Sequence, residues 1–526
     1  MSRKELTKAF SLLVCLMLVL VLFIGCSTTA QSSGGPKQTD DQKSTAGSTE
    51  KTKYAEYTIE ALFPGDTPNG FDQVLAEAES RLADTLNVKL DFQFIPWADY
   101  KQKIQVKIAA GDEFDLHLNA PWLNMNDLIA DKAIQPLDDL IASYAPAIQK
   151  GFEKQVIQSN LFDGKIYGLP LGDVLGGEYK SLIIIRKDLR EKYGMGEITT
   201  VDSFVDYLRK VKENEPGMIP ILWKGSTWVY SRWYWGMNRG FKMLNTNTCP
   251  IYVFFDKDTV QPVKPIYQDA KYLEWLDFAH KLYQEGLIYS DILTVKDDEQ
   301  QFMAGKTAAI YSDGGPSNPS KYSPTLQSNF PDAKVELIEF EGKNVKILSD
   351  FQVWNFEVLN SKSKDPERVM RFLNWIFEDQ ANYDLLVYGI EGKHWVNKGE
   401  GLYGYPEGID LASNYSFPSY VLCMNVNYER ISANAIDDEI FWKSYLQDIN
   451  NFVQSPLTGF VYKTDNVEAE IAKVSAIWPE VIFPIENGIL SADQALQGAI
   501  DQLNAAGYDK ILEDAQKQIN DFLAGK

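Results

Sequence analysis

Tryptophan and polar side chains follow three strands that the sequence predicts. An indole ring can stack on the C–H face of a sugar, and the hydroxyl groups of that sugar need amide or carboxylate partners. Alternatively, the two tryptophans only cover the edge of the sheet. The three loops run from Pro64 to Asn69, from Ile95 to Tyr100 and from Asn119 to Asn124, and their candidate binding residues are Asp66, Trp97, Asn119 and Trp122.

A second group of aromatic residues is packed into the short segment from Trp223 to Trp235. Gly225 and the residues after it are typical of a loop, which would leave the rings free to line a binding site. The alternative is a core patch, because tryptophan is highly buried on average. The candidates of this segment are Trp223, Trp228, Trp233 and Trp235, and Trp354, which follows Asp350 on a predicted strand, is a further candidate.

The sequence offers little that favours catalysis or cofactor binding. Its three histidines, His117, His280 and His394, have no second histidine or cysteine at metal-ligand spacing. The Ala304–Thr307 run lacks the first glycine of a phosphate-binding loop. We therefore expect no metal, no cofactor and no enzyme activity. The alternative is a glycosidase, because a pair of carboxylates at the required separation could occur among the 73 acidic residues of the chain.

The elements that position the first loops are predicted by hydrophobic periodicity. Alternating apolar residues predict strands at Tyr57–Phe63, Val88–Phe94 and Phe114–Leu118, and apolar residues three or four apart predict helices at 71–86 and 100–108. This β-α-β-α-β order predicts an open α/β sheet with helices on both faces. Ligands of such sheets bind outside the carboxyl ends of the strands, where the three loops lie.

The N-terminus has the pattern of an export signal followed by a lipid attachment site. A basic start and an apolar run from Ala9 to Ile24 predict a signal peptide over residues 1–25. Cys26 resembles the acylated cysteine of a bacterial lipobox, although Phe23 stands where leucine is usual. The alternative is an ordinary secreted protein that is cleaved nearby. Residues 26–53 are polar and predict a disordered tether, so we expect a lipid-anchored protein at the outer face of the cell membrane.

The net charge limits the classes of partner, and the cysteine content limits the disulfide bonds that the chain could form. The net charge of −22 argues against nucleic acid, because phosphate would be repelled. Cys249 and Cys423 are far apart in sequence, and two isolated buried thiols are the expectation, with their pairing left open.

Five longer motifs carry a family resemblance. They are GDEFDLHLNAPW (111–122), FDGKIYGLPLGDVLGGEYKSLIIIRKDL (162–189), FMAGKTAAIYSDGGPSN (302–318), the segment 358–395 with its Tyr-Gly-Ile-Glu-Gly sequence, and the C-terminal stretch 490–520. Together they resemble extracellular solute-binding protein family 1, the substrate-binding lipoproteins of carbohydrate ABC importers. The resemblance implies the periplasmic-binding-protein type II fold, with two lobes of open mixed sheets flanked by helices and a ligand cleft between the lobes. The boundaries expected are 54–178 plus about 350–425 for lobe 1, and about 179–349 plus about 426–526 for lobe 2.

The resemblance also implies site residues and partners. Asp173 before the first crossover, Asp313 in the Ser-Asp-Gly-Gly-Pro turn and Glu391 would face the cleft, and Tyr179 marks the crossover itself. The expected partners are an oligosaccharide ligand and the permease subunits of an ABC importer. The protein itself is expected to be a monomer. The alternatives are a receptor of this fold for peptides or other small solutes, a surface glycoside hydrolase or lyase, and an adhesin without a transporter.

Overall fold

A computed structural model gives the fold of most of the chain. It describes residues 54–172, 182–225, 241–244, 249–256, 259–312, 318–338, 340, 346–422 and 424–525. Residues from Thr52 onward form one compact unit. Within the described residues, no helix combines the length and the apolar character that crossing a membrane requires.

Lobe 1, as we use the name, is built on a five-stranded sheet with the order β2-β1-β3-β12-β4. Strand β1 pairs in parallel with β2 and β3, and β12 is antiparallel to both β3 and β4. The predicted β-α-β-α-β order is therefore confirmed, and the sheet is mixed. Its strands are β1 (Tyr57–Pro64), β2 (Val88–Ile95), β3 (Leu116–Asn119), β4 (Leu169–Leu171) and β12 (Asn355–Leu359).

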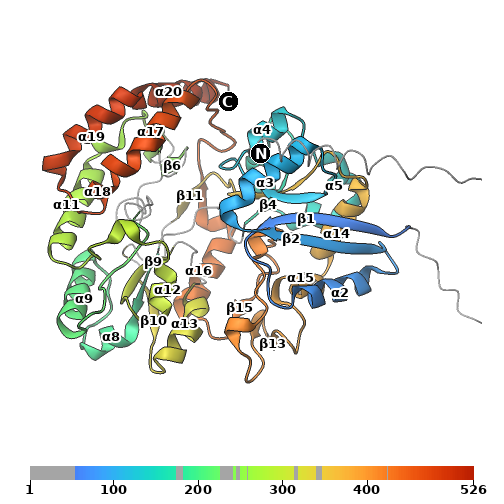
Figure 1. Ribbon diagram of the computed structural model, residues 1–526, viewed down its shortest axis with the longest axis horizontal. Helices are drawn as coiled ribbons and strands as arrows, with labels where there is room; N and C mark the ends of the chain where they lie inside the picture. Colours follow the sequence, from blue (N-terminus) through green and yellow to red (C-terminus); the bar gives the residue numbers. More distant parts are fainter. Residues whose placement is uncertain are drawn as a thin grey trace, which may run out of the picture. The chain divides into compact units, whose positions relative to one another are not determined.

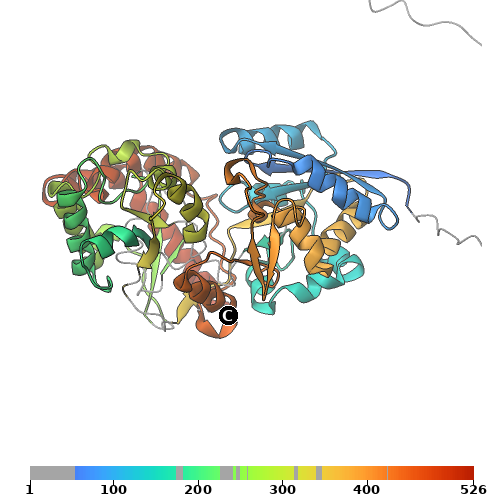
Figure 2. The same ribbon diagram turned by 90° about the horizontal axis from the view of Figure 1, so that it is seen from below.

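Helices cover both faces of this sheet, with α3 on one side and α2 and α15 on the other (Figures 1 and 2). Phe71 of α2 and Phe372 of α14 pack on Phe92 of β2, which joins the helices to the sheet through ring contacts. Helix α14 begins after Asp365, whose side chain accepts a hydrogen bond from the Arg368 amide. The helices are α2 (Phe71–Leu82), α3 (Trp97–Ala110), α4 (Met125–Ala130), α5 (Asp138–Tyr144), α6 (Pro146–Gly151), α7 (Lys154–Ser159), α14 (Pro366–Glu378) and α15 (Gln380–Tyr388).

Lobe 2 has its own core around the sheet β10-β5-β9. The run from Ile183 to Ile185 has no exposed surface, which is typical of a central strand that is covered on both faces. Its strands are β5 (Leu182–Arg186), β9 (Ala309–Ser312) and β10 (Val335–Ile338), with a second sheet of β6 (Phe241–Met243), β7 (Tyr252–Asp256) and β8 (Thr259–Val260). Its helices before residue 330 are α8 (Lys187–Lys192), α9 (Val201–Asn214), η2 (Ile266–Gln268), α11 (Ala270–Gln284), η3 (Ile292–Thr294), α12 (Asp298–Met303) and α13 (Asn318–Asn329).

The C-terminal helices complete lobe 2, although they are distant from its sheet in sequence. Helices α18 and α19 contact α11, and α17 contacts both α19 and α20 (Figure 1). Their buried side chains belong to the same hydrophobic core as Ile184. These helices are α17 (Glu468–Val481), α18 (Phe483–Glu486), α19 (Ala492–Ala506) and α20 (Tyr508–Ala524).

The remaining helices and strands pack against one or both of the two lobes. Strand β11 (Ile347–Ser349) pairs in parallel with β16 (Phe452–Gln454). Helix α16 (Asp437–Gln447) places Trp442 in the lobe 2 core and Leu446 in a smaller core that also contains Phe356 of β12. The rest are β13 (Val396–Gly399), β14 (Leu402–Gly404), β15 (Ile431–Ser432), η5 (Leu411–Ser413), η6 (Ser419–Val421) and η7 (Ile449–Asn451). The expected lobe boundaries stay a prediction.

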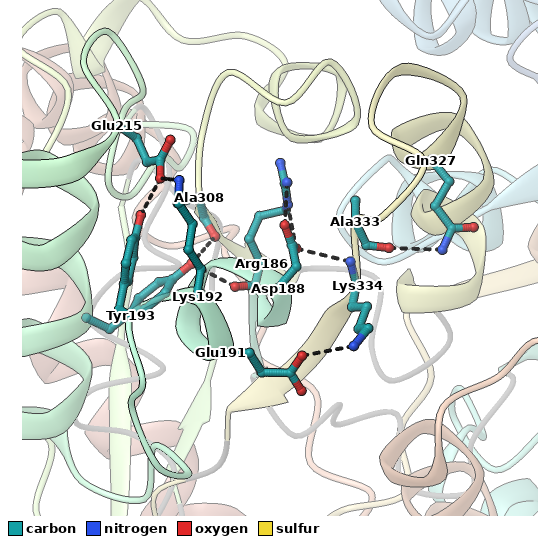
Figure 3. A network of polar contacts seen from close by, with 11 residues as sticks. Arg186, Asp188, Glu191, Lys192, Tyr193, Glu215, Ala308, Gln327, Ala333 and Lys334 are labelled. Atoms are coloured by element: carbon teal, nitrogen blue, oxygen red, sulfur yellow. Dashed lines mark hydrogen bonds and ion pairs between the residues drawn. The ribbon is translucent and has the colours of Figure 1, made fainter.

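A network of charged side chains ties the end of β5 to its neighbours in lobe 2 (Figure 3). Arg186 donates two hydrogen bonds to Asp188, at 2.8 and 2.6 Å. The Lys334 amide donates to the same carboxylate, and the Lys334 ammonium donates to Glu191. These carboxylates are engaged by cations of the protein itself, so we interpret the network as a scaffold that holds α8 against β10.

Two titratable side chains are buried within the lobe 1 sheet. His117 of β3 and Glu357 of β12 have no exposed surface, and neither the ring nitrogens nor the carboxylate oxygens have a hydrogen-bond partner among the described residues. Burial lowers the pKa of His117 to about 3 and raises the pKa of Glu357 well above its ordinary range. Burial thus favours an uncharged imidazole and a protonated carboxylic acid within the sheet.

The buried Glu357 acid makes stability depend on pH. Above the ordinary pKa of about 4.5, the unfolded chain releases a proton that the folded chain retains. The folded state then loses up to about 1.4 kcal/mol per pH unit until its own pKa is reached. We expect Glu357→Gln, which leaves His117 in place, to gain thermal stability over the wild type progressively from pH 5 to pH 8.

Melting temperatures across that pH range measure the effect. Glu407→Gln, at an exposed turn position, is the matched control and should parallel the wild type. Parallel curves for the Glu357 variant and the wild type would contradict the prediction.

Candidate functional site

Four partly exposed aromatic side chains gather at one edge of the lobe 1 sheet. Trp97 begins α3 just after β2, Trp122 lies in the turn after β3, and Trp354 directly precedes β12. Because β12 is antiparallel to β3, the start of β12 lies beside the end of β3, where Phe356 pairs with Asn119. Tyr420 belongs to η6, which packs against β12. We call these four residues the aromatic platform; their exposed fractions are 41%, 40%, 40% and 36%, respectively.

Direct contacts join the members of the platform. The ring centroids of Trp97 and Trp122 are 6.0 Å apart with an angle of 33° between the planes. The Trp122 indole donates a hydrogen bond of 3.0 Å to the Trp354 carbonyl oxygen. Burial raises the pKa of Tyr420, and a hydrogen bond between its hydroxyl and the Trp97 side chain partly offsets that shift.

The buried Tyr100 packs against the aromatic platform and connects it to the sheet. The Trp97 ring meets Tyr100 edge-on at 6.0 Å. The Tyr100 hydroxyl lies within hydrogen-bond distance of the carbonyl oxygens of Leu62 and Leu118, at 3.0 and 2.8 Å, and its single proton can be shared between them, which anchors α3 to β1 and β3. The position of Trp97 is therefore set by the sheet rather than by the loop alone.

The two polar candidates of this edge differ in exposure. Asp66 is exposed in the loop after β1, the strand between β2 and β3. Asn119 is 1% exposed, and the expectation that it contacts ligand is wrong for this structure. Its amide donates to Asn124 at 3.1 Å and accepts from the Ala120 amide at 2.7 Å, so it shapes the turn that carries Trp122.

Trp223 is also corrected from a binding residue to a core residue. It has no exposed surface, its indole donates to Asn487 at 2.7 Å, and its ring lies 6.3 Å from that of Trp275. A ring without accessible surface cannot stack on a ligand. The spacing of aromatic residues is the same for a packed core and for a cleft wall, which is why the sequence left both interpretations open.

Other candidates are not joined to the platform or lie outside the described residues. Glu391 is exposed between α15 and β13, where its backbone pairs with Trp395, and the described contacts do not link it to the platform. Cys249 is buried in the lobe 2 core. The residues that lie outside the described part, and stay predictions, are Cys26, Asp173, Tyr179, Trp228, Trp233, Trp235, Asp313 and Cys423.

Sequence reasoning missed Tyr420. It lies in a segment without helical or strand periodicity and reaches the platform only because η6 packs on β12. The short Pro418-Ser419-Tyr420 sequence carries no signal that would separate it from any other surface tyrosine. Its role depends entirely on tertiary structure.

The platform has the properties of a binding surface for flat, partly apolar ligands. Exposed indole faces favour the C–H faces of sugar rings, and Asp66 at the same edge can accept hydrogen bonds from hydroxyl groups. Within the described part of the chain, no three His, Cys, Asp or Glu side chains are grouped as metal ligands.

Comparison with known families identifies the class of protein. The sequence model of the family described as bacterial extracellular solute-binding protein matches residues 65–383, which is more than half of the chain. The chain therefore belongs to this family. A second model, for a domain of unknown function, matches residues 456–524, which include the C-terminal helices of lobe 2.

Individual relatives support this assignment. The chain is 26% identical over 506 residues to a carbohydrate ABC transporter substrate-binding protein of Streptococcus pneumoniae, covering 93% of this chain and 94% of that protein. It is 24% identical over 312 residues to the melibiose/raffinose/stachyose-binding protein MelE of Bacillus subtilis, covering 57% and 62% of the two chains.

A solved structure supports the fold. The N-glycan transport solute-binding protein NgtS of Streptococcus pneumoniae superimposes with a TM-score of 0.73 at 23% identity, covering 89% of this chain and 99% of that chain. The predicted two-lobed type II fold is confirmed.

The platform predicts a specific loss of affinity. We expect Trp97→Ala and Trp122→Ala each to weaken binding of the protein's ligand about tenfold, because each removes the burial of one ring face, worth about 1.4 kcal/mol. Isothermal titration calorimetry measures the change. Trp375→Ala, a half-buried tryptophan of α14 stacked on Phe372, is the control. Unchanged affinity in both platform variants would exclude the platform as the binding surface.

Proposed function

We propose that this protein is a lipid-anchored extracellular receptor that captures an oligosaccharide between its two lobes and delivers it to an ABC importer. The observation that carries the proposal is the aromatic platform at the ligand-binding edge of the lobe 1 sheet, in a chain of the solute-binding family. A ligand that contacts both lobes stabilises their closed arrangement, because it has a higher affinity for that state. Closure then signals to the permease that the receptor is loaded.

The relatives support a saccharide as the ligand. The two sequence relatives are described as binding proteins for carbohydrates, and NgtS has been solved in complex with Man1GlcNAc and with Man5GlcNAc. Stacking surfaces of several rings suit a ligand of several sugar units better than a monosaccharide. We propose that the protein acts as a monomer and has no enzyme activity of its own.

A titration with a glycan panel tests this function. The compact unit from Thr52 to Lys526 is titrated with neutral plant and microbial oligosaccharides while tryptophan fluorescence is recorded, and the sugar is recovered afterwards. We expect a saturable change at micromolar ligand and an intact sugar. Cleaved product would indicate a glycoside hydrolase or lyase instead.

A second panel tests the alternative that the protein is a receptor for peptides. Peptides of two to eight residues are titrated under the same conditions, with Trp97→Ala beside the wild type. Saturable binding of peptides and none of glycans would replace the saccharide with a peptide as the ligand.

Membrane attachment through Cys26 is a separate part of the proposal. An acylated Cys26 followed by a polar tether would hold the folded part near the membrane without embedding it. We expect Cys26→Ser to move the protein from the detergent phase to the aqueous phase in detergent partitioning of expressing cells. Cys15→Ser, within the predicted signal peptide, should leave the partitioning unchanged. Retention of the Cys26 variant in the detergent phase would contradict lipid attachment.

A further inference from the structure

One buried asparagine fixes the chain segment that carries Trp354. Asn160 follows α7 and is 5% exposed. Its side-chain nitrogen donates to the carbonyl oxygens of Val156 at 2.7 Å and Phe351 at 2.8 Å, and its side-chain oxygen accepts from the Val353 amide at 3.0 Å. A single amide group therefore holds two backbone positions of the segment and ties them to α7.

The held segment, Asp350–Trp354, has a constrained backbone. Phe351 has φ of +57°, which side chains other than glycine rarely adopt, and it is 3% exposed. Such a conformation persists only where the surroundings enforce it. Asn160 contributes to this, because it binds the Phe351 carbonyl, and the Ser349 hydroxyl accepts from the Phe351 amide at 3.0 Å.

The segment Asp350–Trp354 contacts both the aromatic platform and lobe 2. On one side, the carbonyl oxygen of Trp354 accepts the hydrogen bond of the Trp122 indole, the ring that packs on Trp97. On the other side, the Gln352 side chain donates to the Phe460 carbonyl oxygen at 3.0 Å. Phe460 is part of the lobe 2 core. The segment thus connects the aromatic platform with a residue of the other lobe.

We propose that Asn160 is the positioning residue of the aromatic platform and sets ligand affinity without touching the ligand. This inference rests on the proposed function of the platform. Without the Asn160 amide, the backbone at Phe351 and Val353 is no longer held in its strained arrangement. The Trp354 carbonyl then shifts away from the Trp122 indole, and the packed pair of Trp97 and Trp122 loses its fixed geometry.

The test compares two buried asparagines of lobe 1. Asn374 of α14 is 4% exposed and also holds two backbone positions, accepting from the Ala147 and Ile148 amides at 2.8 and 3.4 Å, but its contacts lie among α6 and α14. We expect Asn160→Ala and Asn374→Ala to lower the melting temperature by similar amounts. Only Asn160→Ala should also weaken glycan binding, by fivefold or more, while Asn374→Ala stays within twofold of the wild type.

A ligand-free readout separates this inference from the proposed function. Two indoles at a centroid distance of 6.0 Å give a coupled circular-dichroism signal, which Trp97→Phe identifies by removing it. We expect Asn160→Ala to reduce this signal and Asn374→Ala to preserve it. If the wild type binds no glycan, the proposed function fails, and the spectra alone decide whether Asn160 positions the platform.

An isosteric variant covers the case in which Asn160→Ala does not fold. Asn160→Asp keeps an acceptor for the Val353 amide but loses the donor for Phe351, and it should reduce the coupled signal while retaining more stability. Wild-type spectra in both Asn160 variants would overturn the proposal. Weakened binding with an unchanged spectrum would also overturn it, because the effect would then arise elsewhere than in the platform.

Discussion

The pairing of β12 with β3 is the constraint on which the candidate site depends. Strand β12 comes from a part of the chain more than two hundred residues after β3, and it inserts between β3 and β4 in antiparallel orientation. The register sets Phe356 opposite Asn119, so the residue before the strand arrives next to the turn after β3. A shift of one residue would move every side chain of β12 to the opposite face and place Glu357 where Phe356 now packs.

The local part of the fold could be predicted from hydrophobic periodicity, whereas the return of the chain to lobe 1 after about residue 350 was implied only by the family resemblance. The alternation in Tyr57–Phe63 and Val88–Phe94 and the helical spacing between them reflect burial on one face, which is a local property. The insertion of β12 depends on pairing between distant segments, for which the residues of β12 alone give no indication. The sheet was therefore predicted in its order of elements but not in its full set of neighbours.

For the candidate site, too, the locally determined residues could be predicted from the sequence and the tertiary contacts could not. Trp97 and Trp122 could be proposed because strand ends are recognisable and ligands bind at the carboxyl edge of such sheets. Their contact with Trp354 and Tyr420 is tertiary. Asn119 and Trp223 show the limit of residue-type reasoning: an amide suits a ligand hydroxyl or a backbone turn equally well, and an indole suits a sugar face or a core. Only their exposure, 1% and 0%, distinguishes the two uses.

The polar edges of the two neighbouring indoles are already engaged within the protein. Trp122 donates to the Trp354 carbonyl oxygen, and Trp97 is hydrogen-bonded to Tyr420. What these rings offer outward is a flat apolar face, which can pack on the C–H face of a sugar but makes no directional hydrogen bond to its hydroxyl groups. The platform would then distinguish sugars only by the apolar faces that they present, and recognition of individual hydroxyl groups would fall to polar groups beyond it.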